Sequence, residues 1–318
     1  MANPLAILLV IAHPDDETLY AGFLHAMVHK LKATLDLCCV TNGEGGFRYS
    51  QPCESIYGLN LSNETIARTH LPRIRQEELQ ASGKILGVRK YFYISQKDLK
   101  YSRDIKSVFD EQWDKDLIIR YLCNIIRTGN SETGYDIMLV MLPNVESHGH
   151  HTASGLLALS AIDILQKNQK LDTNMKHASN KIPIVLGGSE FSLAGTNLND
   201  TDIKAQLPEN ELWYKNMITQ IYPQYPLTKL HKTSPIFLFH RTWKLSTNFD
   251  DNPFHPNYHL ILLWMCAAHK SQGSLINETQ TTLAKDIEQY FYFQLNDETN
   301  IQNIQDIFIK LKAEHNTK

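Results

Sequence analysis

One short stretch of the chain combines residue types that can carry out hydrolytic chemistry. His13, Asp15 and Asp16 lie close together directly after the apolar run 5–12. A neutral imidazole and a carboxylate in one tight turn can face the same point, which is how proteins hold a divalent ion such as Zn²⁺. Two ligands are too few, so a third must come from elsewhere in the chain. An alternative role for Asp15 or Asp16 is to cap the helix that follows, because Asp is a preferred N-cap residue.

A second histidine-bearing stretch offers candidates for the third ligand. Residues 135–143 are strongly apolar and predict a buried strand, and His148, His150 and His151 follow it. The chain contains 14 histidines, so a pair spaced by three residues is weak evidence by itself. The position of the pair is more informative. Turns that follow parallel strands meet at one edge of a sheet, so the two stretches can converge on one ion although they are roughly 130 residues apart.

The elements that must position these residues alternate between strands and helices. Short apolar runs predict strands, at residues 5–12, 33–40, 91–94 and 135–143. Helical spacing of apolar residues predicts helices, at residues 17–32, 66–86, 105–128 and 154–166, with Gly87 just beyond the second of them. This alternation predicts an α/β fold with a parallel sheet, whose ligands bind at the carboxyl ends of the strands.

Two local features have ordinary explanations. The glycine-rich turn 41–46 follows the second strand and runs into a long stretch without periodicity, so it lacks the context of a dinucleotide-binding motif. We expect a mobile loop over the crevice there, whose glycines let the backbone approach a ligand. Arg75 and Glu78 lie three residues apart on a predicted helix, and a surface ion pair is the default interpretation of that spacing.

Composition restricts the class of protein. The 318 residues are 42% hydrophobic and 20% charged, with a formal net charge of −3, which is typical of a soluble globular protein and gives no sign of a nucleic-acid partner or an anionic membrane. No Pro/Gly/Ser-rich linker divides the chain. We therefore expect a single domain over 1–318, with a catalytic core over about 1–190 and a loop-rich, helical elaboration over about 191–318.

The same sequence predicts a cytoplasmic protein. The apolar stretch 260–268 is far shorter than the roughly 20 residues that span a bilayer, so no membrane span is expected. The N-terminal apolar run lacks the basic start and the cleavage site of a signal peptide. The five cysteines are an odd number without C-x-x-C spacing, which argues against a disulfide framework or a cysteine zinc site.

Several short motifs together resemble one family. They are A-H-P-D-D-E at 12–17, T-N-G-E at 41–44, R-Q-E-E-L at 75–79 followed by L-G-V at 86–88, H-x-x-H at 148–151, and A-H-K-S-Q at 268–272. Their types and order resemble the LmbE-like/PIG-L metal-dependent deacetylases, over roughly residues 5–273. The first motif is the most specific of the five.

The resemblance implies a Rossmann-like fold, with a mostly parallel sheet, helices on both faces and a C-terminal helical elaboration. It also implies a zinc-dependent hydrolase that removes the acetyl group from an N-acetylglucosamine-type sugar or its conjugate. Carried over residue by residue, the metal ligands are His13, Asp16 and His151, the general base is Asp15, and His148 faces the oxyanion. A His₂Asp set leaves an open coordination position, as catalytic zinc sites do. Another divalent ion such as Fe²⁺, Mn²⁺ or Co²⁺ is an alternative to zinc.

The resemblance also concerns the substrate-binding residues, and the chain differs from the family pattern at one position. The resemblance implies that residues on the crevice wall hold the substrate, and Arg75, Asp98 and Glu44 are the nearest matches. The family usually shows H-P-D-H where this chain has H-G-H-H, so His150 replaces a carboxylate beside His148. This departure leaves open how His148 is oriented and whether it is protonated. It also leaves open whether His150 binds metal in place of His151.

Two other functions remain open at this point. One is a hydrolase of a non-sugar amide, and the other is a binding protein that uses the same crevice without turnover. The intact Asp15 argues against the second, because an inert protein needs no general base. The region 189–256 carries aromatic residues that are more often local core than sugar platforms, namely Trp213, Tyr214, Tyr222, Tyr225 and Trp243. The sequence leaves the exact substrate, the physiological metal and the formation of a homo-oligomer undetermined.

Overall fold

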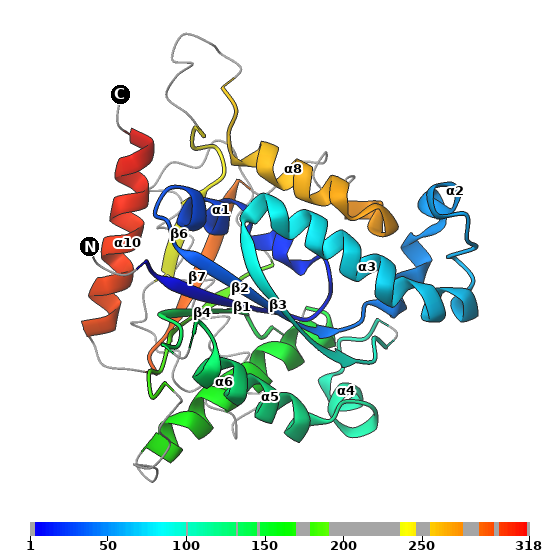
Figure 1. Cartoon of the computed structure of the whole chain (residues 1–318), viewed down its shortest axis with the longest axis horizontal. Coiled ribbons are helices and arrows are strands. Elements are labelled where there is room, and N and C mark those ends of the chain that lie inside the picture. The colour runs from blue at the N-terminus through cyan, green and yellow to red at the C-terminus, as the bar shows by residue number, and fades with distance from the viewer. Residues whose placement is uncertain are drawn as a thin grey trace.

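Seven strands form one sheet in the order β3-β2-β1-β4-β5-β7-β6 (Figure 1). The structure is a computed structural model that describes residues 4–99, 101–131, 133–144, 147–169, 179–190, 236–245, 255–275, 286–295 and 299–316. Five strands are parallel: β1 (Ala6–Ile11), β2 (Thr34–Thr41), β3 (Val88–Gln96), β4 (Ile137–Met141) and β5 (Ile184–Gly188). Two further strands, β6 (Ile236–His240) and β7 (Ile287–Phe293), complete the sheet, and β7 pairs in antiparallel fashion with both β5 and β6. The predicted α/β class with a mostly parallel sheet is confirmed.

The topology predicts a ligand-binding crevice beside the two histidine-bearing stretches. β1 pairs with β2 on one side and with β4 on the other. The chain therefore adds β2 and β3 on one side of β1, and then β4 and β5 on the other side. In open α/β sheets this reversal of strand order separates the strand-to-helix turns and opens the ligand-binding crevice.

Helices cover both faces of the sheet (Figure 1). One layer contains α4 (Ile105–Glu111), α5 (Lys115–Thr128) and α6 (Gly149–Gln169), and the other contains α1 (Ala21–His29), α3 (Glu64–Leu86), α8 (Tyr258–Ala268) and α10 (Thr299–Asn316). Side chains of β1 alternate between the two cores, because successive residues of a strand point to opposite faces. Every residue of β1 is apolar and buried, as expected for a strand covered on both sides.

The structure corrects three predicted elements. The predicted helix 105–128 is broken into α4 and α5, because Asp114 caps α5 by accepting a hydrogen bond from the Leu117 N–H at 2.8 Å. The stretch after the glycine-rich turn, predicted as a loop, contains the short helices η2 (Glu44–Tyr49), η3 (Gln51–Cys53) and α2 (Glu54–Tyr57). The predicted helix 17–32 begins with a separate 3₁₀ turn, η1 (Asp16–Tyr20).

The boundary of α3 agrees with its sequence signals. Asn63 caps the helix by accepting hydrogen bonds from the Thr65 and Ile66 N–H groups. Gly87 ends the helix with φ of 82°, a left-handed conformation in which a residue without Cβ is favoured.

The C-terminal part contributes more than helices. It supplies α8, η5 (Lys270–Gln272) and α10, as the predicted elaboration requires, and also β6 and β7, which extend the sheet beyond β5. The division into a core and an elaboration stays a prediction. Within the described residues, every helix is too short or too polar to cross a membrane.

Candidate active site

The first and second chemical stretches meet beside the carboxyl ends of β1 and β4. His13 follows β1, Asp16 begins η1, and His151 lies in the first turn of α6, which follows β4. Ligand-type atoms of these three residues all lie within 4.8 Å of one another. His13 Nδ1 is 3.1 Å from His151 Nε2 and 3.5 Å from Asp16 Oδ2, and His151 Nε2 is 3.2 Å from Asp16 Oδ1. Tertiary structure thus brings together the three predicted ligands.

Asp16 is held by its own turn. Its Oδ2 accepts hydrogen bonds from the backbone N–H groups of Ala12 at 3.0 Å and His13 at 2.6 Å, so the carboxylate folds back over the end of β1. Burial opposes ionisation of this group, but the adjacent imidazoles of His151 and His13 hold its pKa well below the usual range. Asp16 is therefore a fixed carboxylate.

His151 is oriented by a residue that the sequence did not single out. Its Nδ1 lies 2.5 Å from Glu190 Oε2 and 3.1 Å from Ser147 Oγ, which leaves Nε2 directed to His13 and Asp16. Burial would lower the pKa of His151, but Asp16 and Glu190 raise it well above the ordinary value. The Asp16 and Glu190 carboxylates thus favour a positive charge at His151 Nε2. A divalent cation suits both this charge and the two-nitrogen, one-carboxylate donor set.

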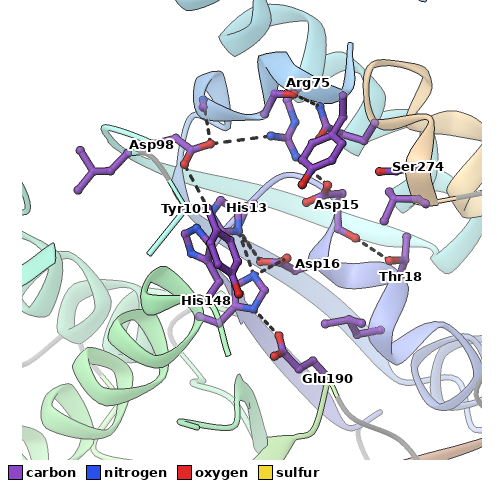
Figure 2. A pocket seen from close by; sticks show the side chains of 18 residues that line it. His13, Asp15, Asp16, Thr18, Arg75, Asp98, Tyr101, His148, Glu190 and Ser274 are labelled. Atoms are coloured by element: carbon purple, nitrogen blue, oxygen red, sulfur yellow. Dashed lines mark hydrogen bonds and ion pairs between the residues drawn. The ribbon is translucent and has the colours of Figure 1, made fainter. Parts of the chain in front are cut away.

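A pocket of about 390 Å³ opens beside this cluster (Figure 2). Seven of the eight predicted site residues line its wall, and five of them are His13, Asp15, Arg75, Asp98 and His148. His151 and Asp16 line it as well, and so does Glu190. Figure 2 shows Arg75 above Asp15, with Asp16 just below Asp15 and Glu190 at the lower end of the group. The cluster is therefore accessible to a small molecule.

Asp15 forms an ion pair and does not cap a helix. Its Oδ2 lies 2.8 Å from Arg75 Nη2, and its side chain makes no capping hydrogen bond to η1. Burial raises the pKa of Asp15 although the Arg75 guanidinium opposes this shift. The local sequence signal for an N-cap was misleading here, because a buried guanidinium competes for the carboxylate.

The surface ion pair predicted for Arg75 and Glu78 is wrong. Arg75 is only 2% exposed and donates a hydrogen bond from Nη1 to the Gly43 carbonyl at 2.6 Å. Glu78 is also buried and accepts hydrogen bonds from Tyr57 Oη at 2.7 Å and from the backbone N–H of Ser271 at 2.8 Å. Both side chains face inward because η2 and η5 cover this face of α3.

His148 lines the pocket as a neutral imidazole. Burial and the neighbouring rings of His13, His150 and His151 lower its pKa to about 2. Its Nδ1 accepts a hydrogen bond from the His150 backbone N–H at 3.1 Å, which leaves the ring proton on Nε2. His148 can therefore donate a hydrogen bond without being charged. The sequence had left the orientation and protonation of this ring open, because His150 lies where a carboxylate was expected.

His150 takes a different direction from His151. It is fully buried, stacks on Trp113 with ring centroids 5.0 Å apart, and does not line the pocket. Its Nδ1 lies 3.0 Å from His13 Nε2, the ring nitrogen opposite to the one that faces His151. The structure thus places His151 beside Asp16, and His150 behind His13.

The remaining two predicted wall residues differ in position. Asp98 lines the pocket and accepts a hydrogen bond from the Gly45 backbone N–H at 2.9 Å. Burial opposes its ionisation, but His13, His150 and Arg75 hold its pKa below the usual range. Glu44 lies outside the pocket lining, is 7% exposed, and has Oε1 3.9 Å from Arg68 Nη1. A substrate contact by Glu44 stays a prediction.

The motif at 268–272 contacts the motif at 12–17 through a buried hydrogen bond. His269 and Glu17 are both fully buried, and His269 Nε2 lies 2.6 Å from Glu17 Oε1. Ser82 of α3 donates a second hydrogen bond to the same oxygen at 2.5 Å. Gln272 of η5 lines the pocket and donates to the Gly46 carbonyl at 3.3 Å. Motifs at opposite ends of the domain thus support one wall.

Sequence reasoning missed several pocket residues. Glu190 comes two residues after β5, the strand beside β4, so its position at the carboxyl edge of the sheet was the available signal. Tyr49 and Tyr101 line the pocket while 54% and 65% exposed, and no spacing rule marks either of them. Of the aromatics in 189–256, Trp243 packs on Phe239 and His240, outside the pocket lining. The other four lie outside the described residues.

Comparison with known proteins agrees with the sequence motifs. A family profile described as PIG-L, GlcNAc-PI de-N-acetylase, matches residues 8–162, which contain the A-H-P-D-D-E and H-x-x-H motifs. No curated protein sequence matches the chain.

Solved structures of similar fold include two deacetylases and one hydratase. The N,N′-diacetylchitobiose deacetylase of Pyrococcus horikoshii is 17% identical, over 69% of this chain and 73% of that one, with a TM-score of 0.41. The A40926 pseudoaglycone deacetylase Dbv21 is 12% identical, over 93% and 100%, with a TM-score of 0.48. GalB, the 4-carboxy-2-hydroxymuconate hydratase of Pseudomonas putida KT2440, is 17% identical, over 69% and 80%, with a TM-score of 0.42.

The profile match spans the elements that bring both histidine-bearing stretches to the pocket, from β1 into α6. The chain therefore carries a domain of the PIG-L (LmbE-like) GlcNAc-PI de-N-acetylase family.

Proposed function

We propose that this protein is a metal-dependent N-deacetylase that hydrolyses the acetamide of an N-acetylglucosamine-type sugar or its conjugate. One observation carries the proposal: His13, Asp16 and His151 converge on the wall of a pocket that Asp15 and His148 also line. The family of the domain, whose description names a de-N-acetylase, supports the same reaction.

The donor set supports a divalent ion held by His13 Nδ1, His151 Nε2 and the Asp16 carboxylate. Zn²⁺ is the first choice, with Fe²⁺, Mn²⁺ and Co²⁺ as alternatives, because imidazole and carboxylate accept all four. Such an ion, when bound, would polarise the acetamide carbonyl and lower the pKa of water. Glu190 orients His151 from behind, as carboxylates commonly orient metal-ligating histidines.

Asp15 is the general base in this proposal. It accepts a proton from the attacking water and later gives it to the leaving amine, and its raised pKa brings it closer to the operating pH than an ordinary Asp. Arg75 holds the carboxylate by Oδ2, so Asp15 keeps one orientation through both transfers. The buried guanidinium is itself fixed by the Gly43 carbonyl.

His148 stabilises the developing negative charge. Because its proton is on Nε2, the neutral ring donates a hydrogen bond to the acetamide oxygen as that oxygen gains charge. A preorganised neutral donor requires no change of protonation during the reaction. A charged imidazole, which the sequence left open for His148, is not needed for this role.

The mouth of the pocket suits a ring-shaped substrate. Tyr49 and Tyr101 are exposed there, and the Tyr101 ring lies 4.9 Å from the His148 ring. Aromatic faces bury the apolar surface of a bound ring while the Tyr hydroxyl groups stay in water. We assign these two side chains to the part of the substrate beyond the acetamide.

The test is acetate release from a panel of N-acetylated sugars and non-sugar acetamides, with protein loaded with one equivalent of Zn²⁺ or Co²⁺. Release from N-acetylated sugars that is lost in Asp15→Asn is the expected result. Release only from non-sugar acetamides would replace the proposed substrate class. Binding of sugars without any acetate release would indicate a binding protein.

A further inference from the structure

The two ring nitrogens of His13 face different sets of ligand-type atoms. Nδ1 faces His151 and Asp16, as described above. Nε2 faces His150 Nδ1 at 3.0 Å and Asp98 Oδ1 at 3.7 Å, and these two atoms are 3.3 Å from each other. A second triangle of two nitrogens and one carboxylate oxygen therefore lies on the opposite side of the same ring.

The dimensions of this triangle fit a metal ion. Ligand atoms at about 2.0 to 2.1 Å from a tetrahedral Zn²⁺ are about 3.3 to 3.4 Å apart. The three separations of 3.0, 3.3 and 3.7 Å bracket that value. His148 stands next to the triangle, and His13, His148 and His150 together offer ligand atoms that lie within 4.8 Å of one another.

Charge and access also suit a cation. The Asp98 oxygens are divided between two tasks: Oδ2 accepts from the Gly45 N–H and lies 4.0 Å from Arg75 Nη1, whereas Oδ1 faces the two imidazoles. The carboxylate supplies one negative charge beside the two imidazole rings. His13 and Asp98 line the pocket, so an ion can reach the triangle from solvent although His150 is buried.

We propose that the chain binds a second divalent cation, of the class of Zn²⁺ or Co²⁺, between His13 Nε2, His150 Nδ1 and Asp98 Oδ1. The ion takes the place of the hydrogen bond between the two rings. When both sides of His13 are occupied, its remaining ring proton leaves to solvent, so this ion is held more weakly than the first. The inference concerns metal binding and does not depend on the proposed reaction.

The test is a Co²⁺ binding isotherm on the full-length chain, by equilibrium dialysis with elemental analysis. Wild type should saturate at two equivalents. Asp16→Asn should lose the tighter equivalent, and His150→Phe, which keeps a ring against Trp113, should lose the weaker one. His13→Ala should lose both. His29→Gln removes an exposed histidine on α1 and should retain two equivalents.

The pattern of losses decides the outcome. Saturation of wild type at one equivalent, or two equivalents in His150→Phe, would overturn the second site. Because a core substitution can disturb folding, Asp98→Asn serves as a second variant that should also lose the weaker equivalent. Thermal unfolding of each variant identifies any that is not folded. If either His150→Phe or Asp98→Asn is unfolded, the other variant shows whether the weaker equivalent is lost.

Discussion

The buried Arg75 of α3 and Asp15 of the turn after β1 form an ion pair, with 2.8 Å between Nη2 and Oδ2. The pair joins the helix layer to the turn that carries the first motif. Its two members have different expected roles, since Asp15 acts on the substrate and Arg75 acts through Asp15. Separate substitutions can therefore distinguish catalysis from positioning.

Asp15→Asn should abolish most turnover and keep the metal. An amide cannot accept the water proton, and general base catalysis typically contributes about 10² to 10⁴ in rate. Acetate release and metal content should be measured on the same preparation. Asp116→Asn changes an exposed carboxylate on α5 and serves as the control, with activity unchanged. Near wild-type turnover in Asp15→Asn would remove Asp15 from the mechanism.

Arg75→Met should destabilise the fold by about 3 to 5 kcal/mol, because it leaves the largely buried Asp15 carboxylate without its partner. Urea unfolding measures this loss. Arg73→Met on the same helix is the matched control: Arg73 is exposed and pairs with Glu77 at 3.2 Å, so about 0 to 1 kcal/mol is expected. Equal losses in the two variants would show that burial of Arg75 contributes little.

Arg75→Lys should retain the charge but lower kcat more than it changes KM. A lysine cannot reproduce the guanidinium contacts to both Asp15 and the Gly43 carbonyl, so the base loses its fixed orientation. Steady-state kinetics on the best substrate of the panel provide the measurement. Unchanged kcat would indicate that Asp15 is oriented without Arg75.

Glu190→Gln should weaken metal affinity by about 10- to 100-fold, the usual cost of losing a carboxylate behind a metal-ligating histidine. The measurement is competition with a chelator of known affinity. Glu77→Gln, at an exposed position on α3, should leave affinity unchanged. Wild-type affinity in Glu190→Gln would mean that Ser147 alone suffices to orient His151.

Tyr101→Ala and Tyr49→Ala should raise KM with a smaller effect on kcat, because both side chains lie at the pocket mouth. Aromatic contacts of this kind are worth about 0.5 to 1.5 kcal/mol, which corresponds to roughly 2- to 13-fold in KM. Tyr121 is exposed on α5 outside the pocket lining, so Tyr121→Ala is the control. A fall in kcat alone would place the tyrosines nearer to the reacting atoms.

The pH–rate profile should contain no limb from His148. Its pKa of about 2 lies far below neutral pH, and a bound cation would lower it further, so the ring is neutral across the range from about pH 4 to pH 9. His148→Gln should lower turnover while the residual activity keeps the limbs of wild type. An alkaline limb that is present in wild type and absent in the variant would show that the charged imidazole is the active form.

The sequence alone determined the alternation of elements and the chemistry of the two stretches. Apolar runs and helical spacing are local signals, so they predicted the strands around His13 and the parallel sheet that places both stretches at one edge. Residue types within one turn predicted a histidine and a carboxylate of a candidate metal site, and the second stretch supplied candidates for the third ligand. The burial of Arg75 and the position of Glu190 were not predictable in this way, since each depends on elements distant in sequence.

Only the tertiary structure showed which of His150 and His151 lies beside Asp16. Both lie in the first turn of α6, where successive side chains point about 100° apart around the helix axis. The packing of α6 against the sheet sends His151 to the Nδ1 side of His13 and His150 to the Nε2 side. Which ring nitrogen each meets is a matter of helix orientation, and adjacent residues of the same type carry no local signal for it.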